Sequence, residues 1–272
     1  MSLKEILNSN TELYVDGGLY YQKDLNNSSA FEKLYLELRQ KEGRLYPDEV
    51  VKKLPELSFN HIHQNEWAIR KTSALWLISY LKNKSHLKNI LEVGCGNGWL
   101  SNMLARTLPV EVCGVDTNEK ELTQASRLFE FKRLYFIKAN VMESFLFPGV
   151  FDVIILASSI QYFSALNLLI ERLLDLLTLR GEIHIIDSPI CYSKKESAES
   201  YERSSNYFGS LGLEKMSDHY HYHTFDALTG FCHKVIFNPK AFLPVFKRKV
   251  FGIQSTPFPW IKIVRINKID QN

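Results

Sequence analysis

A chain of 272 residues with 45% hydrophobic residues is long enough to bury a substantial core, so we expect one large domain or one domain with an added segment. Lysine and arginine exceed aspartate and glutamate by only +3 and are spread along the chain, which argues against nucleic acid and anionic membranes as partners. The apolar stretches are too short to span a bilayer, no signal peptide is evident, and the four cysteines indicate reduced thiols in a cytoplasmic protein.

The first 65 residues are polar and rich in tyrosine, and they predict an N-terminal helical cap. A helix is expected from Ser29 to Lys41, where Phe31, Leu34, Tyr35 and Leu38 form an apolar stripe. A second short helix is expected just after Pro47. The rest of the chain, 66–272, is predicted to form the ligand-binding domain.

A stronger helix is predicted from Asn65 to Leu81. Arg70 falls on its inward stripe, between Trp67 and Ala74. An unpaired buried charge is costly, so Arg70 needs a partner. That partner is either Glu66 or a carboxylate on a ligand.

From residue 89 onward, short apolar strands alternate with helices, which predicts an α/β fold with a doubly wound parallel sheet covered on both faces. Its ligand crevice is expected at the carboxyl ends of the strands. The predicted strands are 89–93, 110–116, 133–140, 151–158 and 181–188. Residues 189–225 are predicted to be a lid-like insertion, and 232–239 and 259–267 an antiparallel strand pair at one end of the sheet.

A glycine-rich turn, "GCGNG", joins the first of these strands to a helix. Such a turn suits NAD, FAD or S-adenosylmethionine, because its glycines and the free N–H groups of the helix can contact the ligand closely. Trp99 occupies the third position of the dinucleotide pattern that starts at Gly94, where a small residue is expected. Glu92, inside the strand, would repel a pyrophosphate and favours a ligand with a positive ammonium or sulfonium group.

Polar residues follow the next two strands. Asp116 can accept hydrogen bonds from both hydroxyls of a ribose, and Asn140 can bond the edge of an adenine. The fourth strand ends in small residues that leave room for a ligand.

Five segments resemble class I S-adenosylmethionine-dependent methyltransferases in order and spacing, and together they cover Ile90 to Asp187. They are "ILEVGCGNGWLS", "VCGVDTN", "FIKANVMES", "FDVIILASSIQYF" and "LLTLRGEIHIID". The resemblance implies a seven-stranded sheet of order 3-2-1-4-5-7-6 with the last strand antiparallel. It also implies S-adenosyl-L-methionine as cofactor, with S-adenosyl-L-homocysteine as product.

Through this resemblance, specific residues are assigned to parts of the cofactor. Glu92, Gly94 and Gly96 would lie under its methionine part, Asp116 would bind the ribose, Asn140 and Val141 would contact the adenine, and Ala157 and Ser158 would lie near the sulfonium. The predicted cofactor-binding residues are Arg70, Glu92, Gly94, Cys95, Gly96, Asp116, Thr117, Asn140, Val141, Ala157 and Ser158.

Catalytic residues are weakly marked, because the sulfonium already activates the methyl group. The segment "ASSIQYF" lacks the Asn/Asp-Pro-Pro-Tyr and Pro-Cys signatures of base and C5-pyrimidine methylation, and Gln161 or Tyr162 stands where relatives often carry a histidine. The candidates are Tyr162, Asp187 and His223. His219, His221 and His223 would share a face of one strand, but no carboxylate or cysteine accompanies them, so no metal site is predicted.

The sequence therefore predicts a methyltransferase acting on a small-molecule acceptor. It does not indicate whether the methylated atom is oxygen, nitrogen or carbon. The alternatives are a catalytically silent methyltransferase-like binding protein and an NAD-binding oxidoreductase. The second would need a catalytic Tyr-x-x-x-Lys or its equivalent near the fourth or fifth strand, and we find none there.

Overall fold

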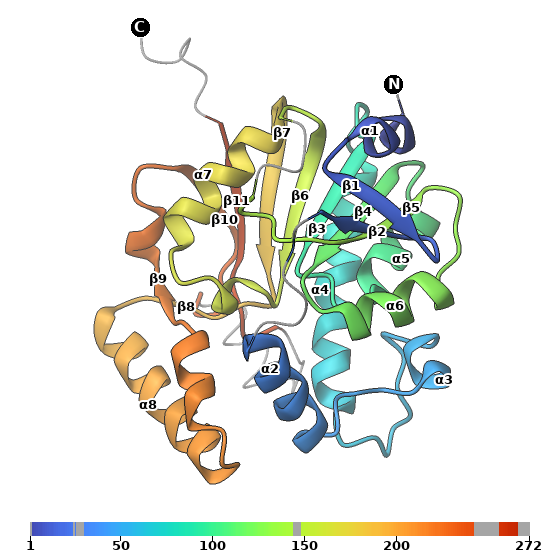
Figure 1. Cartoon of the computed structure of the whole chain (residues 1–272). Coiled ribbons are helices and arrows are strands. Elements are labelled where there is room, and N and C mark those ends of the chain that lie inside the picture. Colours follow the sequence, from blue (N-terminus) through green and yellow to red (C-terminus); the bar gives the residue numbers. More distant parts are fainter. Residues whose placement is uncertain (1, 24, 26–29, 144–147, 242–255, 266–272) are drawn as a thin grey trace, which may run out of the picture.

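The structure of the chain is a computed structural model, which describes residues 2–23, 25, 30–143, 148–241 and 256–265. One large sheet organises these residues, with helices on both of its faces and a further group of helices at the carboxyl ends of its parallel strands (Figure 1). Within the described residues, no helix combines the length and the apolar character needed to cross a bilayer.

The sheet has nine strands in the order β1-β2-β5-β4-β3-β6-β7-β11-β10, so the predicted seven-stranded order is wrong for the sheet as a whole. The strands are β1 (Leu13–Asp16), β2 (Leu19–Gln22), β3 (Asn89–Val93), β4 (Glu111–Asp116), β5 (Leu134–Lys138), β6 (Phe151–Ala157), β7 (Leu177–Ile186), β10 (Cys232–Phe237) and β11 (Trp260–Val264). The central strands β5, β4, β3, β6 and β7 are parallel, as predicted. At one end, β11 lies antiparallel between β7 and β10, which confirms the predicted strand pair.

The two additional strands come from the N-terminal segment, for which we predicted helices but no strands. β1 and β2 form an antiparallel hairpin, and β2 continues the sheet by pairing in parallel with β5, Tyr20 opposite Ile137. The hairpin turns at Gly17 and Gly18, both with positive φ, which suits glycine in a two-residue turn. The N-terminal segment therefore contributes to the sheet as well as to the cap.

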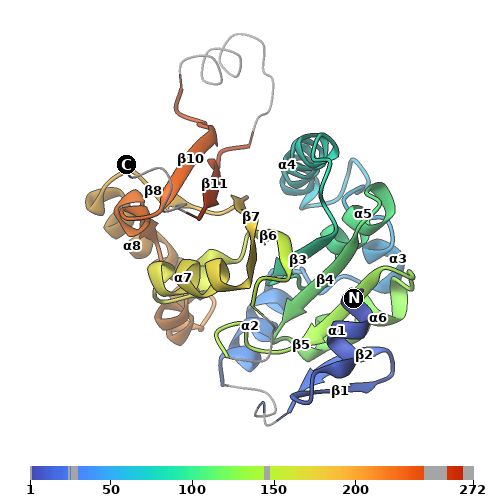
Figure 2. The same cartoon turned by 90° about the horizontal axis from the view of Figure 1, so that it is seen from above.

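Helices cover both faces of the sheet (Figure 2). The α-helices of the described residues are α1 (Leu3–Ser9), α2 (Ala30–Lys41), α3 (Asp48–Val51), α4 (Gln64–Lys82), α5 (Trp99–Thr107), α6 (Glu119–Leu128), α7 (Leu166–Leu176) and α8 (Lys194–Ser210). The leucines of α1 and α7 pack on one face in one buried cluster, and α4, α5 and α6 pack on the other face in a second. The fully apolar central strands are thus shielded on both sides, as a parallel sheet requires.

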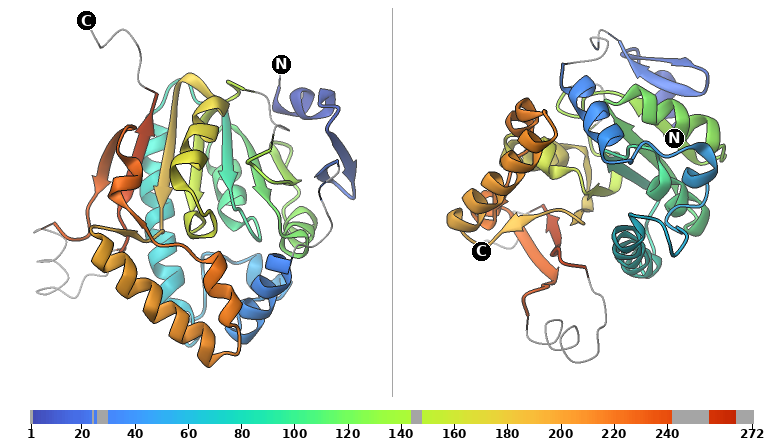
Figure 3. Two further views of the ribbon diagram at one scale, coloured as in Figure 1. Left: turned by 60° about the vertical axis from the view of Figure 1, so that its left-hand side comes forward. Right: turned by 90° about the horizontal axis from the view of Figure 1, so that it is seen from below.

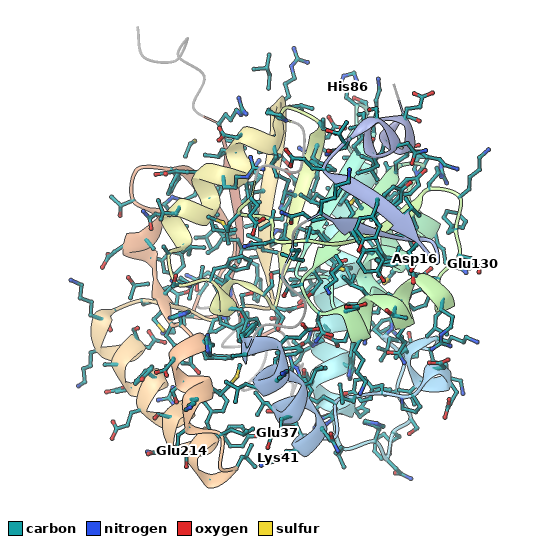
Figure 4. All side chains as sticks on the ribbon, viewed as in Figure 1. Asp16, Glu37, Lys41, His86, Glu130 and Glu214 are labelled. Atoms are coloured by element: carbon teal, nitrogen blue, oxygen red, sulfur yellow. The ribbon has the colours of Figure 1, made fainter. Side chains whose placement is uncertain are left out.

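A third cluster joins α2 to α8 beneath the carboxyl ends of the strands (Figure 3). Its buried members are Leu38 of α2, Phe208 of α8, Leu213, and Met216 from the short 3-10 helix Glu214–His219. Beside this cluster, Lys41 of α2 pairs with Glu37 at 3.1 Å and donates to the carbonyl oxygen of Leu211 at 2.6 Å (Figure 4).

Candidate functional site

A cavity opens where β3, β4, β5 and β6 end, and α2 and the start of α4 close its other side; we call it the glycine-loop cavity. Every predicted cofactor-binding residue lines it: Arg70, Glu92, Gly94, Cys95, Gly96, Asp116, Thr117, Asn140, Val141, Ala157 and Ser158. Residues that are up to 88 positions apart therefore meet at one place because parallel strands present their carboxyl ends at the same edge. Their contacts to a ligand stay a prediction.

The turn between β3 and α5 requires glycine for two separate reasons. Gly94 has φ +74, and a Cβ there would lie 2.5 Å from the Cβ of Ser159. Gly98, at the N-cap of α5, has φ +73, and a Cβ there would lie 2.6 Å from the Phe136 ring. Any side chain would push the turn away from its neighbours, so the backbone at the cavity floor is fixed by close packing.

Asp116, at the end of β4, holds the glycine turn in place. One carboxyl oxygen accepts a hydrogen bond from the N–H of Gly96 at 2.8 Å, and the other accepts from the N–H of Asn118 at 2.9 Å. Burial nevertheless raises the pKa of this carboxyl. A carboxylate oxygen accepts more than one hydrogen bond, so Asp116 keeps capacity for a ligand hydroxyl.

Two further carboxyls in the cavity hold protons unusually well. Burial, together with the nearby Asp116, raises the pKa of Glu92 to about 8 and that of Glu121 to about 7. Glu92 accepts a hydrogen bond from the hydroxyl of Ser101, whereas Oε2 of Glu121 is buried and has no hydrogen-bond partner within the described residues. Such acidic groups favour a ligand that brings positive charge.

Glu121, in the first turn of α6, is a cavity residue that was not predicted from the sequence. Its N–H donates to Oδ1 of Asn118, the N-cap of the helix, at 3.1 Å. The Glu121 side chain lines the glycine-loop cavity and approaches the Gly96 backbone. Its position in the first turn of α6, directly after β4, could have marked Glu121 as a site residue, because that turn faces the same edge of the sheet as the glycine loop.

Arg70 has the protein partner that the sequence offered as one alternative. Its Nε donates to Oε1 of Glu66 at 3.1 Å, and its Nη2 donates to Oγ of Ser158 at 3.2 Å. The guanidinium also lies 5.3 Å from the centre of the Trp67 ring. Arg70 thus links α4 to the end of β6, where the sulfonium was predicted, and a ligand carboxylate as second partner stays a prediction.

Helix α2 adds two residues that the sequence did not predict for the site, Tyr35 and Arg39. Arg39 lies 4.8 Å over the Tyr35 ring, 3.4 Å from Glu42 and 3.4 Å from the hydroxyl of Tyr162. Tyr35 was read as part of an apolar stripe, and Arg39 follows it by four residues on the same face. The apolar stripe of the predicted helix indicated that this face is buried, but it did not indicate that a cavity lies beneath it.

At the predicted adenine position, Asn140 is held by its neighbours. Its backbone N–H donates to Oε1 of Gln22 at 3.0 Å, and its side-chain amide donates to Glu143 at 3.2 Å. Gln22 belongs to β2, so the N-terminal hairpin reaches the edge of the glycine-loop cavity. Val141 next to it is buried.

A second cavity adjoins the first, and we call it the α8 cavity. The two share Arg39, Arg44, Glu66, Arg70, Ser158 and Tyr162. The α8 cavity is further lined by Leu38, Glu42, Ile69, Gln161, Asp187, Ser204, Tyr207, Phe208, Tyr220, Pro257 and Phe258. A molecule in it would lie beside Ser158, across from a ligand of the glycine-loop cavity.

The three catalytic candidates fall in different places. Tyr162 lines both cavities, and its ring packs against those of Tyr35 and Tyr220 at 5.6 Å each. Asp187 lines the α8 cavity. His223 lines neither; it is buried, and its Nε2 faces the carbonyl oxygen of Ile160 at 3.1 Å.

The histidine row does not form the expected strand. β9 consists only of His223 and Thr224 and pairs with β8 (Ile190–Cys191), while His219 ends a 3-10 helix and packs 5.1 Å from Phe31. The polar alternation was therefore not that of a surface strand. In the part of the chain that the structure describes, no group of three or more histidine, cysteine, aspartate or glutamate residues is arranged to hold a metal ion.

The sequence comparisons cover the middle of the chain. Residues 90–181 match a family model described as a methyltransferase domain. No curated protein matches the chain significantly.

Similar solved structures cover most of the chain at low identity. The plantazolicin methyltransferase BpumL, solved with a triazolic desmethylPZN analog and SAH, has a TM-score of 0.54 at 20% identity, over 87% of this chain and 98% of that one. Geranyl diphosphate C-methyltransferase from Streptomyces coelicolor A3(2) has a TM-score of 0.53 at 13% identity, over 87% and 98%. Magnesium protoporphyrin IX methyltransferase from Synechocystis PCC 6803, solved with bound SAM, has a TM-score of 0.54 at 13% identity, over 89% and 100%.

At these identities the structural similarity establishes the fold alone. Together with the match of residues 90–181 to the methyltransferase-domain model, it confirms the predicted resemblance to class I S-adenosylmethionine-dependent methyltransferases.

Proposed function

We propose that this protein transfers the methyl group of S-adenosylmethionine to a small-molecule acceptor. The observation that carries the proposal is the set of acidic side chains around a glycine turn at the strand ends: Glu92, which is buried, and Asp116 and Glu121, which are half-buried. A nucleoside with a sulfonium and an ammonium group matches these acids, whereas a pyrophosphate would meet repulsion. Relatives that carry SAM or SAH, and that act on peptide-derived, terpenoid or porphyrin molecules by name, support the same choice.

Within this proposal the cofactor lies in the glycine-loop cavity. Asp116 receives the ribose hydroxyls, Asn140 and Val141 meet the adenine, and Gly94 and Gly96 let the methionine part lie against the backbone, above Glu92. Cys95 and Thr117 flank the turn and the ribose position. Ala157 and Ser158 border the methyl group, and Arg70 is placed to bind the methionine carboxylate.

The acceptor occupies the α8 cavity, in line with the methyl group. The reaction needs little beyond alignment and exclusion of water, because the donor is already activated. The N-terminal residues 1–65 and the segment 189–225 supply α2, α8 and Tyr220 to this cavity. We assign acceptor choice to them, and we place the protein in the cytoplasm on the basis of its cysteines.

Calorimetry with S-adenosylmethionine, S-adenosylhomocysteine and NAD tests the proposal. Both sulfur ligands should bind, and NAD should not. Asp116→Asn should weaken binding of S-adenosylhomocysteine by about 10- to 100-fold, since hydrogen bonds to a charged group are worth about 1.5–3 kcal/mol. Asp16→Asn, at an exposed carboxyl on β1, is the matched control and should leave affinity unchanged (Figure 4).

The outcomes separate the alternatives. NAD binding without either sulfur ligand would overturn the proposal and favour an oxidoreductase. Binding of the sulfur ligands without methyl transfer to any member of a broad acceptor library would favour the catalytically silent binding protein instead.

A further inference from the structure

Asp187 lines the α8 cavity and follows β7 directly. Its neighbour across the sheet is Ser158, whose N–H donates to the carbonyl of Ile186 at 3.0 Å. Both residues have left-handed backbones, with φ +51 at Asp187 and φ +56 at Ser158, although neither is glycine. Strained backbones of this kind persist where the surrounding structure enforces them, and they gather at functional sites.

Asp187 is 5% exposed, and its carboxylate can still accept a proton. Ser73 donates a hydrogen bond to Oδ1 at 2.6 Å, and Thr256 gives a further side-chain hydrogen bond. The charged groups that face it are Arg70, which pairs with Glu66 instead, and Glu66 itself. Burial raises the pKa of Asp187 to about 6, so the group is ionised at neutral pH yet more basic than an ordinary aspartate.

The residues that line the walls of the α8 cavity indicate what kind of acceptor molecule would bind next to Asp187. Five aromatic residues form part of them: Tyr162, Tyr207, Phe208, Tyr220 and Phe258, with Leu38 and Ile69 as aliphatic neighbours. Rings that line a cavity pack well against flat apolar molecules by stacking or edge contacts. Of the charged residues in the lining, Arg39, Arg44, Glu66 and Arg70 also line the glycine-loop cavity, whereas Glu42 and Asp187 line the α8 cavity alone.

We infer that Asp187 is the general base of the transfer and that the acceptor is a flat, largely apolar molecule bearing an acidic ring O–H or N–H. This inference rests on the proposed function. The acceptor heteroatom attacks the methyl carbon with its lone pair, the carbon–sulfur bond breaks with its electron pair retained by sulfur, and S-adenosylhomocysteine leaves. The acceptor proton passes to Asp187 and from there to solvent.

The other two candidates fit this role less well. The hydroxyl of Tyr162 is engaged with Arg39, and its ring forms part of the cavity wall. His223 faces a backbone carbonyl outside both cavities. Of the three candidates, only Asp187 is buried, carries a carboxylate that can accept a proton, and lines the α8 cavity.

The test uses the full chain, S-adenosylmethionine and a panel of phenols, naphthols, hydroxyquinolines and indazoles, with formation of S-adenosylhomocysteine as the readout. We expect turnover of at least one member, and Asp187→Asn should lower its kcat by about 100-fold. Binding of S-adenosylhomocysteine should stay within twofold in this variant, because Asp187 does not line the glycine-loop cavity. That measurement also shows that the variant is folded.

The pH profile separates a base from a merely structural carboxylate. Wild-type kcat should rise with pH to a plateau, with a midpoint near 6, and Asp187→Asn should lose the rise. Ser73→Ala is the matched variant: it removes a hydrogen bond that lowers the pKa of Asp187, so it should move the midpoint to higher pH and keep the plateau.

Three results would overturn the inference: kcat of Asp187→Asn within threefold of wild type, an unshifted profile in Ser73→Ala, or no turnover of any ring O–H or N–H by protein that binds S-adenosylhomocysteine. Failure to bind either sulfur ligand is a different result, and it would overturn the proposed function itself.

Discussion

Glu92 and Glu121 give the glycine-loop cavity a charge that changes near neutral pH. With pKa values of about 8 and about 7, both are largely protonated at pH 6 and ionise as the pH rises. A sulfonium or ammonium group binds the ionised forms better than the neutral ones. Ligand binding and proton release are therefore coupled at these two residues.

We predict that S-adenosylmethionine binds more tightly as the pH rises from 6 to 8.5, by about tenfold if one proton is released. Calorimetry at pH 7 in phosphate and in Tris measures the released protons through the buffers' different ionisation enthalpies. Glu92→Gln should flatten the pH dependence, while Glu130→Gln, at an exposed position (Figure 4), should not change it. A dissociation constant that is independent of pH in the wild type would contradict the coupling.

The same two residues affect the stability of the protein without ligand. Their folded-state pKa values exceed the ordinary value of 4.5, so the folded chain binds extra protons between that pH and about 8. Their stabilising contribution is complete below pH 4.5 and is lost as the pH rises through 7 and 8. The urea midpoint should thus fall between pH 6 and 9, and fall less in Glu92→Gln.

Among the elements, the β1–β2 hairpin has a role beyond lengthening the sheet. Gln22 at its end accepts the N–H of Asn140 and donates to Glu143, and so braces the turn that follows β5. We predict that Gln22→Ala weakens binding of S-adenosylhomocysteine by about three- to tenfold, the worth of about one hydrogen bond. Val15→Ala, at a 53% exposed site on the same hairpin, is the control; equal effects of the two would show that the hairpin acts only through stability.

At the other end of the sheet, a charged network ties β7 to β11 and α4. Glu182 pairs with Lys84 at 2.7 Å and Lys262 at 3.1 Å, accepts from Tyr80 at 2.9 Å, and lies 3.3 Å from His184. Its cationic and hydrogen-bonding partners hold its pKa far below the usual range although burial alone would raise it. Removing this acid leaves two lysines without their shared partner.

Glu182→Gln should lower the free energy of unfolding by about 2 kcal/mol, which urea denaturation measures. The exposed pair of Lys71 and Glu56 provides the comparison, and Glu56→Gln should cost less than about 0.5 kcal/mol because water screens it. A loss in Glu182→Gln no larger than in Glu56→Gln would show that the network contributes little.

For the molecule as a whole, ligand binding should appear as heat resistance. S-adenosylhomocysteine at 100 times its dissociation constant stabilises the folded state by about 2.7 kcal/mol. In a chain of this size that raises Tm by about 5–10 °C. Scanning fluorimetry measures the shift, NAD at the same concentration serves as the control, and a shift with NAD alone would contradict the proposed ligand.

Most of the fold was predictable because the parallel strands are short apolar runs and the helices carry clear caps and stripes. The β1–β2 hairpin was missed because its strands are only four residues long and lack apolar–polar alternation. Its signal was the Gly17–Gly18 pair between tyrosine-containing runs, which is typical of a two-residue turn.

For the candidate site, residues fixed by local strand–turn–helix geometry were predictable. Gly94, Gly96 and Asp116 follow directly from the ends of two adjacent strands. Arg39 reaches the cavity only because α2 packs there, some 50 residues before the glycine turn in the chain. Long-range packing of this kind leaves no periodic pattern in one sequence. The sequence therefore predicted a helical cap, but not which of its residues line the cavity.

The two cavities draw in part on different stretches of the chain. The glycine loop and the strand ends lie within residues 90–181, whereas α8 and the segment before β11 touch only the α8 cavity. In such a protein, acceptor specificity can change during evolution while cofactor binding stays the same. Exchanging α8 alone is therefore the economical route to redirecting such an enzyme, and comparisons confined to the shared stretch will group together proteins that modify unrelated molecules.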